Sequence, residues 1–300
     1  MNSFQGNKKF NKVFDTTNYV VQDPLAKVNT LAKGSNLIIG SSSFNEKESN
    51  LIYIGKVIEN STSRNYLAND VWLDVKFPHV IYITGTRGSG KSFDLGVLLE
   101  GVSELQERTN IQHNIPSICS FLIDTQSQFW TLKYKPNSKI EANKQQLEEL
   151  KKWNLPDNQL KNCQLWRISD KDKITGEEKT FQIRPNLVKH EEWCEILAID
   201  IYGPQGYALN RAIESVKNKN YSLTDLINYI RIPSNLPDIQ SNSKSALIYK
   251  LEEYENIGLF NTTGVEISDL LVPGRCNVFL LRDLRDVDKS LVTCVLARQL

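Results

Sequence analysis

The sequence lacks several patterns that mark particular classes of protein. Its five cysteines, at positions 119, 163, 194, 276 and 294, include no C-x-x-C pair and no zinc-ligand spacing. Lysine plus arginine (36) nearly balance aspartate plus glutamate (35), so no overall basic field indicates a nucleic-acid binder, although the balance leaves room for a local basic surface. No apolar run approaches the roughly 20 residues that span a bilayer, and no apolar block follows the basic N-terminus. We therefore expect a cytoplasmic protein in a reducing compartment, without membrane contact.

One stretch carries a strong chemical signal. The apolar run 80–83 leads into Gly85-Thr-Arg-Gly-Ser-Gly-Lys91-Ser92 and then into a helical pattern, which matches the phosphate-binding signature G-x-x-x-x-G-K-[ST]. Glycines let the backbone approach a polyphosphate, and the following helix N-terminus favours negative charge. Lys91 is predicted to lie between the β- and γ-phosphates, and the Ser92 hydroxyl to ligate Mg²⁺. The alternative is a glycine turn with an incidental lysine. We predict nucleotide contacts from Gly85, Thr86, Arg87, Gly88, Ser89, Gly90, Lys91, Ser92 and Phe93.

Apolar periodicity divides the chain into four parts. These are a flexible N-terminal arm (1–30), a small β module (31–76), a nucleotide-binding core (77–135 and 265–300) and a mainly helical insertion (136–264). Continuous apolar runs favour strands buried on both faces of a parallel sheet, and the core holds three such runs, at 80–84, 117–123 and 276–282. The fold class predicted from this order is α/β with a parallel sheet.

Two carboxylates follow apolar runs of the core. Asp124 ends the second run, where parallel sheets gather ligands, and we expect it to polarise the attacking water or to hold Mg²⁺ together with Ser92. The alternative is that Asp124 caps a turn. For Asp283, in a similar position, a local cap is at least as good an interpretation. No apolar strand ending in an acidic residue follows position 283, so we expect either the N-terminal part of a longer protein or a catalytically incomplete domain.

The order of these segments resembles the HerA-like ATPases of the FtsK–HerA superfamily, particularly the type called domain of unknown function 87. The resemblance covers roughly residues 50–300. It is carried by IGKVI (54–58), VWLDV (71–75), PHV (78–80) before GTRGSGKS (85–92), LGVLLE (95–100), FLIDTQSQFW (121–130), FQIRP (181–185), EW (192–193), GLF (258–260) and LLVPG (270–274) through 284.

The resemblance implies a RecA-like P-loop fold with a helical insertion and a small N-terminal β-barrel. It also implies a homohexameric ring, ATP and Mg²⁺ as ligands, and ATP-driven translocation of duplex DNA with a nuclease or antiphage effector as partner. Such relatives usually carry Asp-x-x-Gly-Glu after the second strand, whereas here Ser127 and Gln128 follow Asp124. Gln128 cannot act as a base but can orient a water molecule. The predicted catalytic residues are therefore Lys91, Asp124 and Gln128.

Two other functions stay open at this stage. One is a nucleotide-binding scaffold that assembles with an effector and hydrolyses little or no ATP, which Gln128 and the missing acidic strand both favour. The other is a different P-loop class, such as a conjugation or packaging ATPase.

Overall fold

The computed structural model describes residues 30–33, 36–41, 50–60, 65–103, 118–153, 155, 157–168, 175–217 and 219–300. The chain divides into two compact units, which are described separately below. The first comprises 1–120, 131–163 and 273–276, and the second comprises 121–130, 164–272 and 277–300. The predicted flexible arm, except for its last residue, lies outside the described residues.

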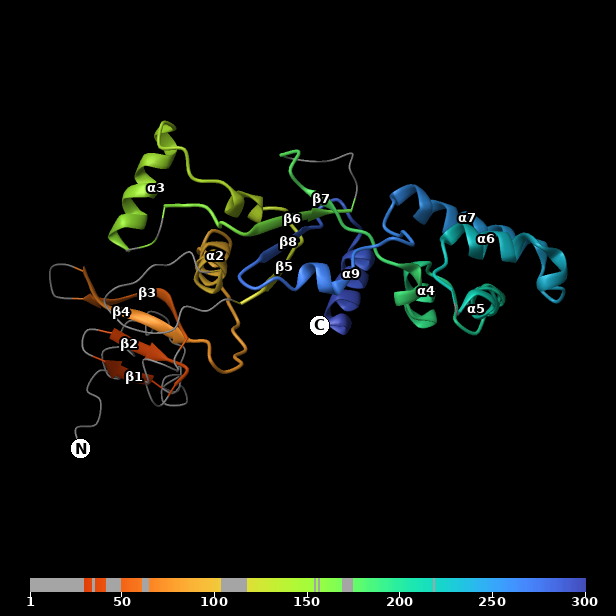
Figure 1. Ribbon diagram of the computed structural model, residues 1–300, viewed down its shortest axis with the longest axis horizontal. Coiled ribbons are helices and arrows are strands. Elements are labelled where there is room, and N and C mark those ends of the chain that lie inside the picture. The colour runs from red at the N-terminus through yellow and green to blue at the C-terminus, as the bar shows by residue number, and fades with distance from the viewer. Residues whose placement is uncertain are drawn as a thin grey trace. The chain divides into compact units, whose positions relative to one another are not determined.

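A four-stranded sheet begins the first unit. Its strands are β1 (Thr30–Lys33), β2 (Asn36–Ile39), β3 (Leu51–Asn60) and β4 (Asn65–Asp74). The strand order is β1-β2-β4-β3, with an antiparallel pair at each side and β2 parallel to β4 between them (Figure 1). Trp72 is fully buried beside Tyr53 and donates its indole N–H to Asn36 Oδ1 at 2.8 Å. Strands β2, β3 and β4 therefore lie within the range 31–76 that the sequence predicts as a β module, and closure into a barrel stays a prediction.

Two helices complete the first unit. Helix α2 (Lys91–Val102) follows the phosphate loop, and α3 (Glu141–Lys152) is a charged helix within the range 136–264, which the sequence predicts to be mainly helical. No residue of α3 is buried, and its i,i+3 ion pairs at the surface contribute little to stability. The Tyr53 hydroxyl donates to Trp153 O at 2.5 Å, which connects the end of α3 to strand β3.

A second four-stranded sheet forms the centre of the second unit. Its strands are β5 (Ser120–Asp124), β6 (Cys163–Arg167), β7 (Lys179–Thr180) and β8 (Cys276–Leu280), in the order β5-β8-β6-β7. Ser120 N donates to Arg275 O, and Leu281 N donates to Asp124 O, so residue numbers rise together along β5 and β8, as in a parallel pair. Strand β8 is buried along its whole length, as a continuous apolar run predicts. The predicted α/β class with a parallel sheet is confirmed.

One strand prediction is wrong. Residues 78–85 form no strand, and the side chains of Val80 and Tyr82 are almost fully exposed. Side chains of this type favour extended backbone, but a strand also needs a neighbour for its N–H and C=O groups, and no described residue pairs with this segment. Strands β6 and β7 complete the sheet instead; they lie in the mainly helical range 136–264, where the run CQLWRI (163–168) by itself predicts a strand.

The remaining helices of the second unit lie where the sequence periodicity places them. They are α4 (His190–Ile196), α5 (Pro204–Val216), α6 (Leu223–Arg231), α7 (Ser241–Ile257), α8 (Ile267–Leu270) and α9 (Asp286–Gln299). Helix α6 has Ser222 as its N-cap; the Ser222 Oγ accepts from Asp225 N at 3.2 Å, while the Asp225 carboxylate accepts from Ser222 N. This reciprocal cap satisfies two backbone donors of the first turn.

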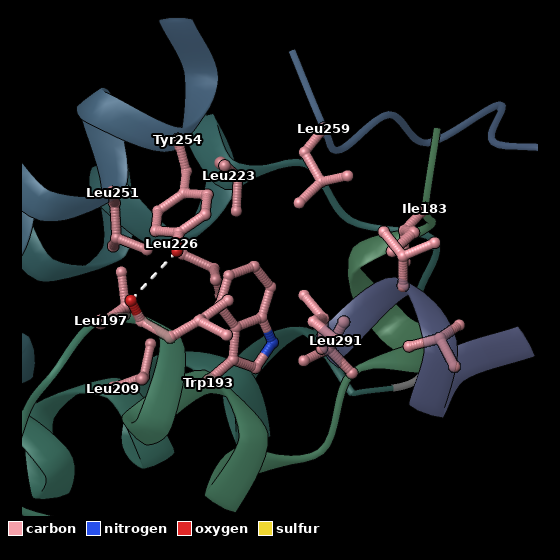
Figure 2. Packing of buried hydrophobic residues seen from close by; sticks show 14 of the residues in the cluster. Ile183, Trp193, Leu197, Leu209, Leu223, Leu226, Leu251, Tyr254, Leu259 and Leu291 are labelled. Carbon is pink, nitrogen blue, oxygen red and sulfur yellow. Dashed lines mark hydrogen bonds between the residues drawn. The ribbon is translucent and has the colours of Figure 1, made fainter. Parts of the chain in front are cut away.

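One hydrophobic core joins these helices to the sheet. Trp193 of α4, Leu226 of α6 and Tyr254 of α7 converge on it, as Figure 2 shows, and all three are buried. Leu291 of α9 and Phe279 of β8 belong to the same cluster. At roughly 25 cal/mol per Å² of buried apolar surface, this cluster is the main source of stability in the second unit.

Two segments that carry the family resemblance form neighbouring backbone in the second unit. Ile183 N donates to Leu259 O at 2.8 Å, and Asn261 N donates to Ile183 O at 3.0 Å. The Gln182 side chain adds a bond from Nε2 to Gly258 O at 2.8 Å. The FQIRP and GLF motifs therefore pair with each other, which gives both a structural role.

None of the helices in the ranges given above is both long enough and apolar enough to cross a bilayer.

Candidate nucleotide-binding site

The phosphate loop is a compact turn that closes on itself. A Cβ added at Gly85 would lie 2.4 Å from Ser89 Oγ, so this position accepts no side chain without a rearrangement. Gly88 and Gly90 have φ values of 81° and 93°, a conformation that costs other residues roughly 1–2 kcal/mol. Residues 85–90 are all exposed, so the backbone of the loop is accessible to a ligand.

Lys91 folds back over this loop. Its Nζ donates to Gly85 O at 2.9 Å and to Thr86 O at 2.6 Å. Two of the three ammonium donors are thus held by carbonyl oxygens of the loop, in an exposed position where a more negative acceptor can compete for them. The side chain that the sequence assigns to phosphate contact therefore lies directly on the phosphate loop.

Helix α2 begins at the end of the loop without a side-chain cap. Its N-cap residue is Gly90, which has no side chain that could accept a bond from the first turn of the helix. Uncapped N–H groups and the helix dipole together make an anion-binding end. Ser92 and Phe93 are exposed on this first turn, as is Arg87 within the loop.

These features fit a nucleoside triphosphate with Mg²⁺. At Gly85, where the loop is tightest, no Cβ is present. The ammonium group of Lys91 lies on the loop, and the N-cap residue of α2 provides no side-chain acceptor. Within the described ranges, no cluster of three or more histidine, cysteine or acidic side chains is arranged to hold a metal by itself.

The chain was also compared with known proteins. The sequence model of the family described as "Helicase HerA, central domain" matches residues 52–300, which is most of the chain. The chain belongs to this family. No curated protein matched it.

Membership of the HerA family places the chain among the P-loop ATPases of the FtsK–HerA type. It favours this assignment over the conjugation and packaging ATPases that the phosphate loop alone leaves open. The resemblance inferred from the order of the motifs is confirmed, and with it the RecA-like character of the α/β core.

Asp124 is found at the end of β5, in the second unit of the HerA-type chain. The residue is 4% exposed, and its carboxylate accepts from Gln126 N at 3.2 Å and from Phe129 N at 2.7 Å. The second bond caps the 3₁₀ helix η2 (Phe129–Lys133). The capping role that the sequence offers as an alternative is therefore present, and a role toward water or Mg²⁺ stays a prediction.

Ser127 occupies the position where HerA relatives are expected to carry glycine. Its φ is 52°, which is left-handed and unusual for a residue with a side chain. Its Oγ accepts from Arg282 N at 3.3 Å, so the loop after β5 is joined to the residues after β8. Serine here adopts a conformation that favours glycine, and its hydrogen bond offsets part of the strain. Gln128, the predicted water-orienting residue, is exposed beside it.

Two residues with unusual surroundings escaped the sequence analysis. Burial raises the pKa of Glu100, on α2, to about 7. Arg167, at the end of β6, is buried and pairs with Asp283 at 3.1 Å. The sequence offers only a weak signal for either residue, because a glutamate in a helix and an arginine after a strand are both common on surfaces.

Proposed function

We propose that this chain is the ATP-hydrolysing motor of a HerA-type complex, which forms a hexameric ring, translocates duplex DNA and works with a nuclease or another effector. The observation that carries the proposal is Lys91, whose ammonium lies on a glycine loop that leads into an uncapped helix. Family membership supports the motor class. The five cysteines are free thiols, which supports a reducing, cytoplasmic location.

Each predicted site residue has a role in this proposal. Lys91 exchanges the carbonyls of Gly85 and Thr86 for phosphate oxygens, which are the stronger acceptors. Ser92 and Asp124 are the side chains that would hold Mg²⁺, which when bound neutralises charge on the phosphates. Gln128 orients the attacking water through its amide and takes no proton. Arg87 reaches the phosphates or a neighbouring subunit.

ATP hydrolysis with and without duplex DNA tests the motor. Lys91→Ala should lower turnover by at least about a hundredfold, as expected for the loss of a charged group at the transferred phosphate. Lys144→Ala, which removes an exposed lysine of α3, is the matched control and should leave turnover unchanged. Light scattering should show six copies of the 34.3 kDa chain. A monomer whose ATPase ignores DNA would contradict the proposal.

A second candidate function is a nucleotide-dependent scaffold with little or no hydrolysis. It is favoured by Asp124, whose two oxygens already accept backbone N–H groups, and by Gln128 in place of a carboxylate. Binding and activity of the effector should be measured with ATP and with a non-hydrolysable analogue. Equal activity with both favours the scaffold, whereas activity with ATP alone favours the motor.

A further inference from the structure

Arg167 carries a buried guanidinium whose N–H donors find few acceptors among the described residues. Only 6% of the residue is exposed. Its Nη1 donates to Asp283 Oδ2 at 3.1 Å, and its buried Nε–H has no acceptor in the part of the chain that the structure describes. Buried polar atoms without a partner are rare in folded proteins, and each calls for an explanation such as a bound ion or a catalytic role.

The carboxylate that faces Arg167 is held loosely. The Asp283 side chain is 57% exposed, whereas the Arg167 side chain is 7% exposed. A carboxylate that stays hydrated compensates a buried charge only weakly, and it loses little when it moves away. Asp288 provides the contrast, because it is 1% exposed and is held by Arg285 and Tyr254.

The pair lies at the carboxyl edge of the parallel sheet. Arg167 ends β6, and Asp283 follows β8, its neighbour in the sheet. Strand β5 ends at the same edge, because Leu281 N donates to Asp124 O and Arg282 N donates to Ser127 Oγ. Parallel α/β sheets bind their ligands at this edge.

We propose that Arg167 binds a phosphate group at this edge, and that Asp283 occupies the guanidinium until the phosphate replaces it. A guanidinium presents a planar fork of N–H donors that matches phosphate oxygens two at a time. The unmatched Nε–H supplies one of these donors, and the Nη–H released by Asp283 supplies another. The inference rests on the proposed function, because the phosphate comes either from the nucleotide or from the DNA backbone.

Two substitutions with opposite expected effects test the exchange. Asp283→Asn removes the competing charge and should tighten binding of the phosphate ligand about threefold to tenfold. Arg167→Gln should weaken it at least about tenfold, the effect of losing charged hydrogen bonds. Arg167→Lys keeps the charge without the fork and gives a second variant if Arg167→Gln does not fold. Its binding should also be weaker than that of the wild type.

The binding of Mg²⁺-ATP and of a short DNA duplex should be measured separately for each variant, with Glu266→Gln as control. That control breaks the ion pair between Arg184 and Glu266 and should leave both affinities unchanged. If Asp283→Asn binds ATP more tightly and Arg167→Gln binds it more weakly than the wild type, the phosphate comes from the nucleotide. The same pair of shifts in DNA affinity identifies the duplex as its source. If all variants bind ATP and DNA with the affinity of the wild type, the inference about Arg167 is overturned while the proposed function stands. A wild-type chain that binds neither ligand would overturn the proposed function as well.

Discussion

The phosphate-loop region (residues 77–103) and the sheet-edge region (residues 120–130 and 276–290) are built from the same three components. Each contains an apolar run, a loop residue with positive φ and a carboxyl group shielded from solvent, which is partly buried for Glu100 and fully buried for Asp288. The run 80–83 is largely exposed, whereas β8 is buried along its whole length. An apolar run therefore specifies an extended segment, and its neighbours decide whether that segment becomes a buried strand.

The loops and the carboxyl groups of the two regions also differ in whether they make internal contacts. In the phosphate loop the positive φ values belong to glycines, which expose backbone, while in the sheet-edge loop Ser127 adds a hydrogen bond. Burial raises the pKa of Glu100, whereas Asp288 is buried with Arg285 and Tyr254 as partners. The sheet-edge region is organised for internal stability. The phosphate loop keeps donors and backbone for a ligand.

Replacing one aromatic residue in each region should give the largest difference between the regions in the free energy of unfolding. Phe279→Ala removes a fully buried ring that contacts Phe121, Trp166 and Phe181, and should lower the free energy of unfolding by roughly 3–5 kcal/mol. Tyr82→Ala should change it by less than about 0.5 kcal/mol, because that ring is exposed. Denaturant unfolding of both variants measures the difference. A large loss from Tyr82→Ala would break the comparison, since it would show that the run 80–83 is packed.

The partly buried carboxyl of Glu100, in the phosphate-loop region, should make the stability of the protein depend on pH. Burial raises the pKa of Glu100 from 4.5 to about 7, so between these values the folded state holds a proton that the unfolded state releases. Stability contributed by the neutral carboxyl is complete below pH 4.5 and is lost as pH rises to 7. Glu100→Gln should therefore stabilise the protein at pH 8 by up to about 3 kcal/mol, and hardly at all at pH 4. An equal effect at both pH values would contradict this account.

Removing the charge of Asp288, a buried carboxyl of the sheet-edge region, should lower the stability of the protein instead of raising it. Asp288 accepts from Arg285 Nε at 2.9 Å, and the Tyr254 hydroxyl lies 2.6 Å from its other oxygen. Asp288→Asn should destabilise the protein at pH 8 by about 2 kcal/mol, the usual worth of a charged hydrogen bond. Thermal unfolding of Asp288→Asn beside Glu100→Gln gives the test, and a stabilising effect of both would remove the distinction between the two carboxyls.

Substituting the loop residues that have positive φ, Ser127 and Gly88, should have the smallest effect on stability. Ser127→Gly relieves a left-handed serine but loses the bond to Arg282 N, and the two terms nearly cancel to within about 1 kcal/mol. Gly88→Ala adds a strain of roughly 1–2 kcal/mol at φ 81° and should also weaken nucleotide binding. Unfolding and nucleotide titration of the two variants separate these effects. A Ser127→Gly variant that loses several kcal/mol would indicate a larger role for its hydroxyl.

Local signals in the sequence predicted most of the second unit. Continuous apolarity located β5 and β8, and apolar periodicity located the mainly helical range that contains α4 to α7. The phosphate loop followed from a motif whose residues are contiguous. What the sequence did not predict depends on contacts between distant residues, namely the unpaired run 80–84 and the burial of Arg167 opposite Asp283. No local pattern encodes the partner of a strand or the environment of a side chain 116 positions from its counterpart.

The most direct test of the central claim is equilibrium binding of Mg²⁺-ATP to the wild type and to Lys91→Ala by titration calorimetry. We expect the wild type to bind one nucleotide per chain. Lys91→Ala should bind at least about tenfold more weakly, because it loses charged hydrogen bonds to phosphate. Unfolding of the variant should be unchanged, since the bonds to Gly85 and Thr86 are exposed. Equal affinity of the two proteins, or no binding by the wild type, would contradict the account.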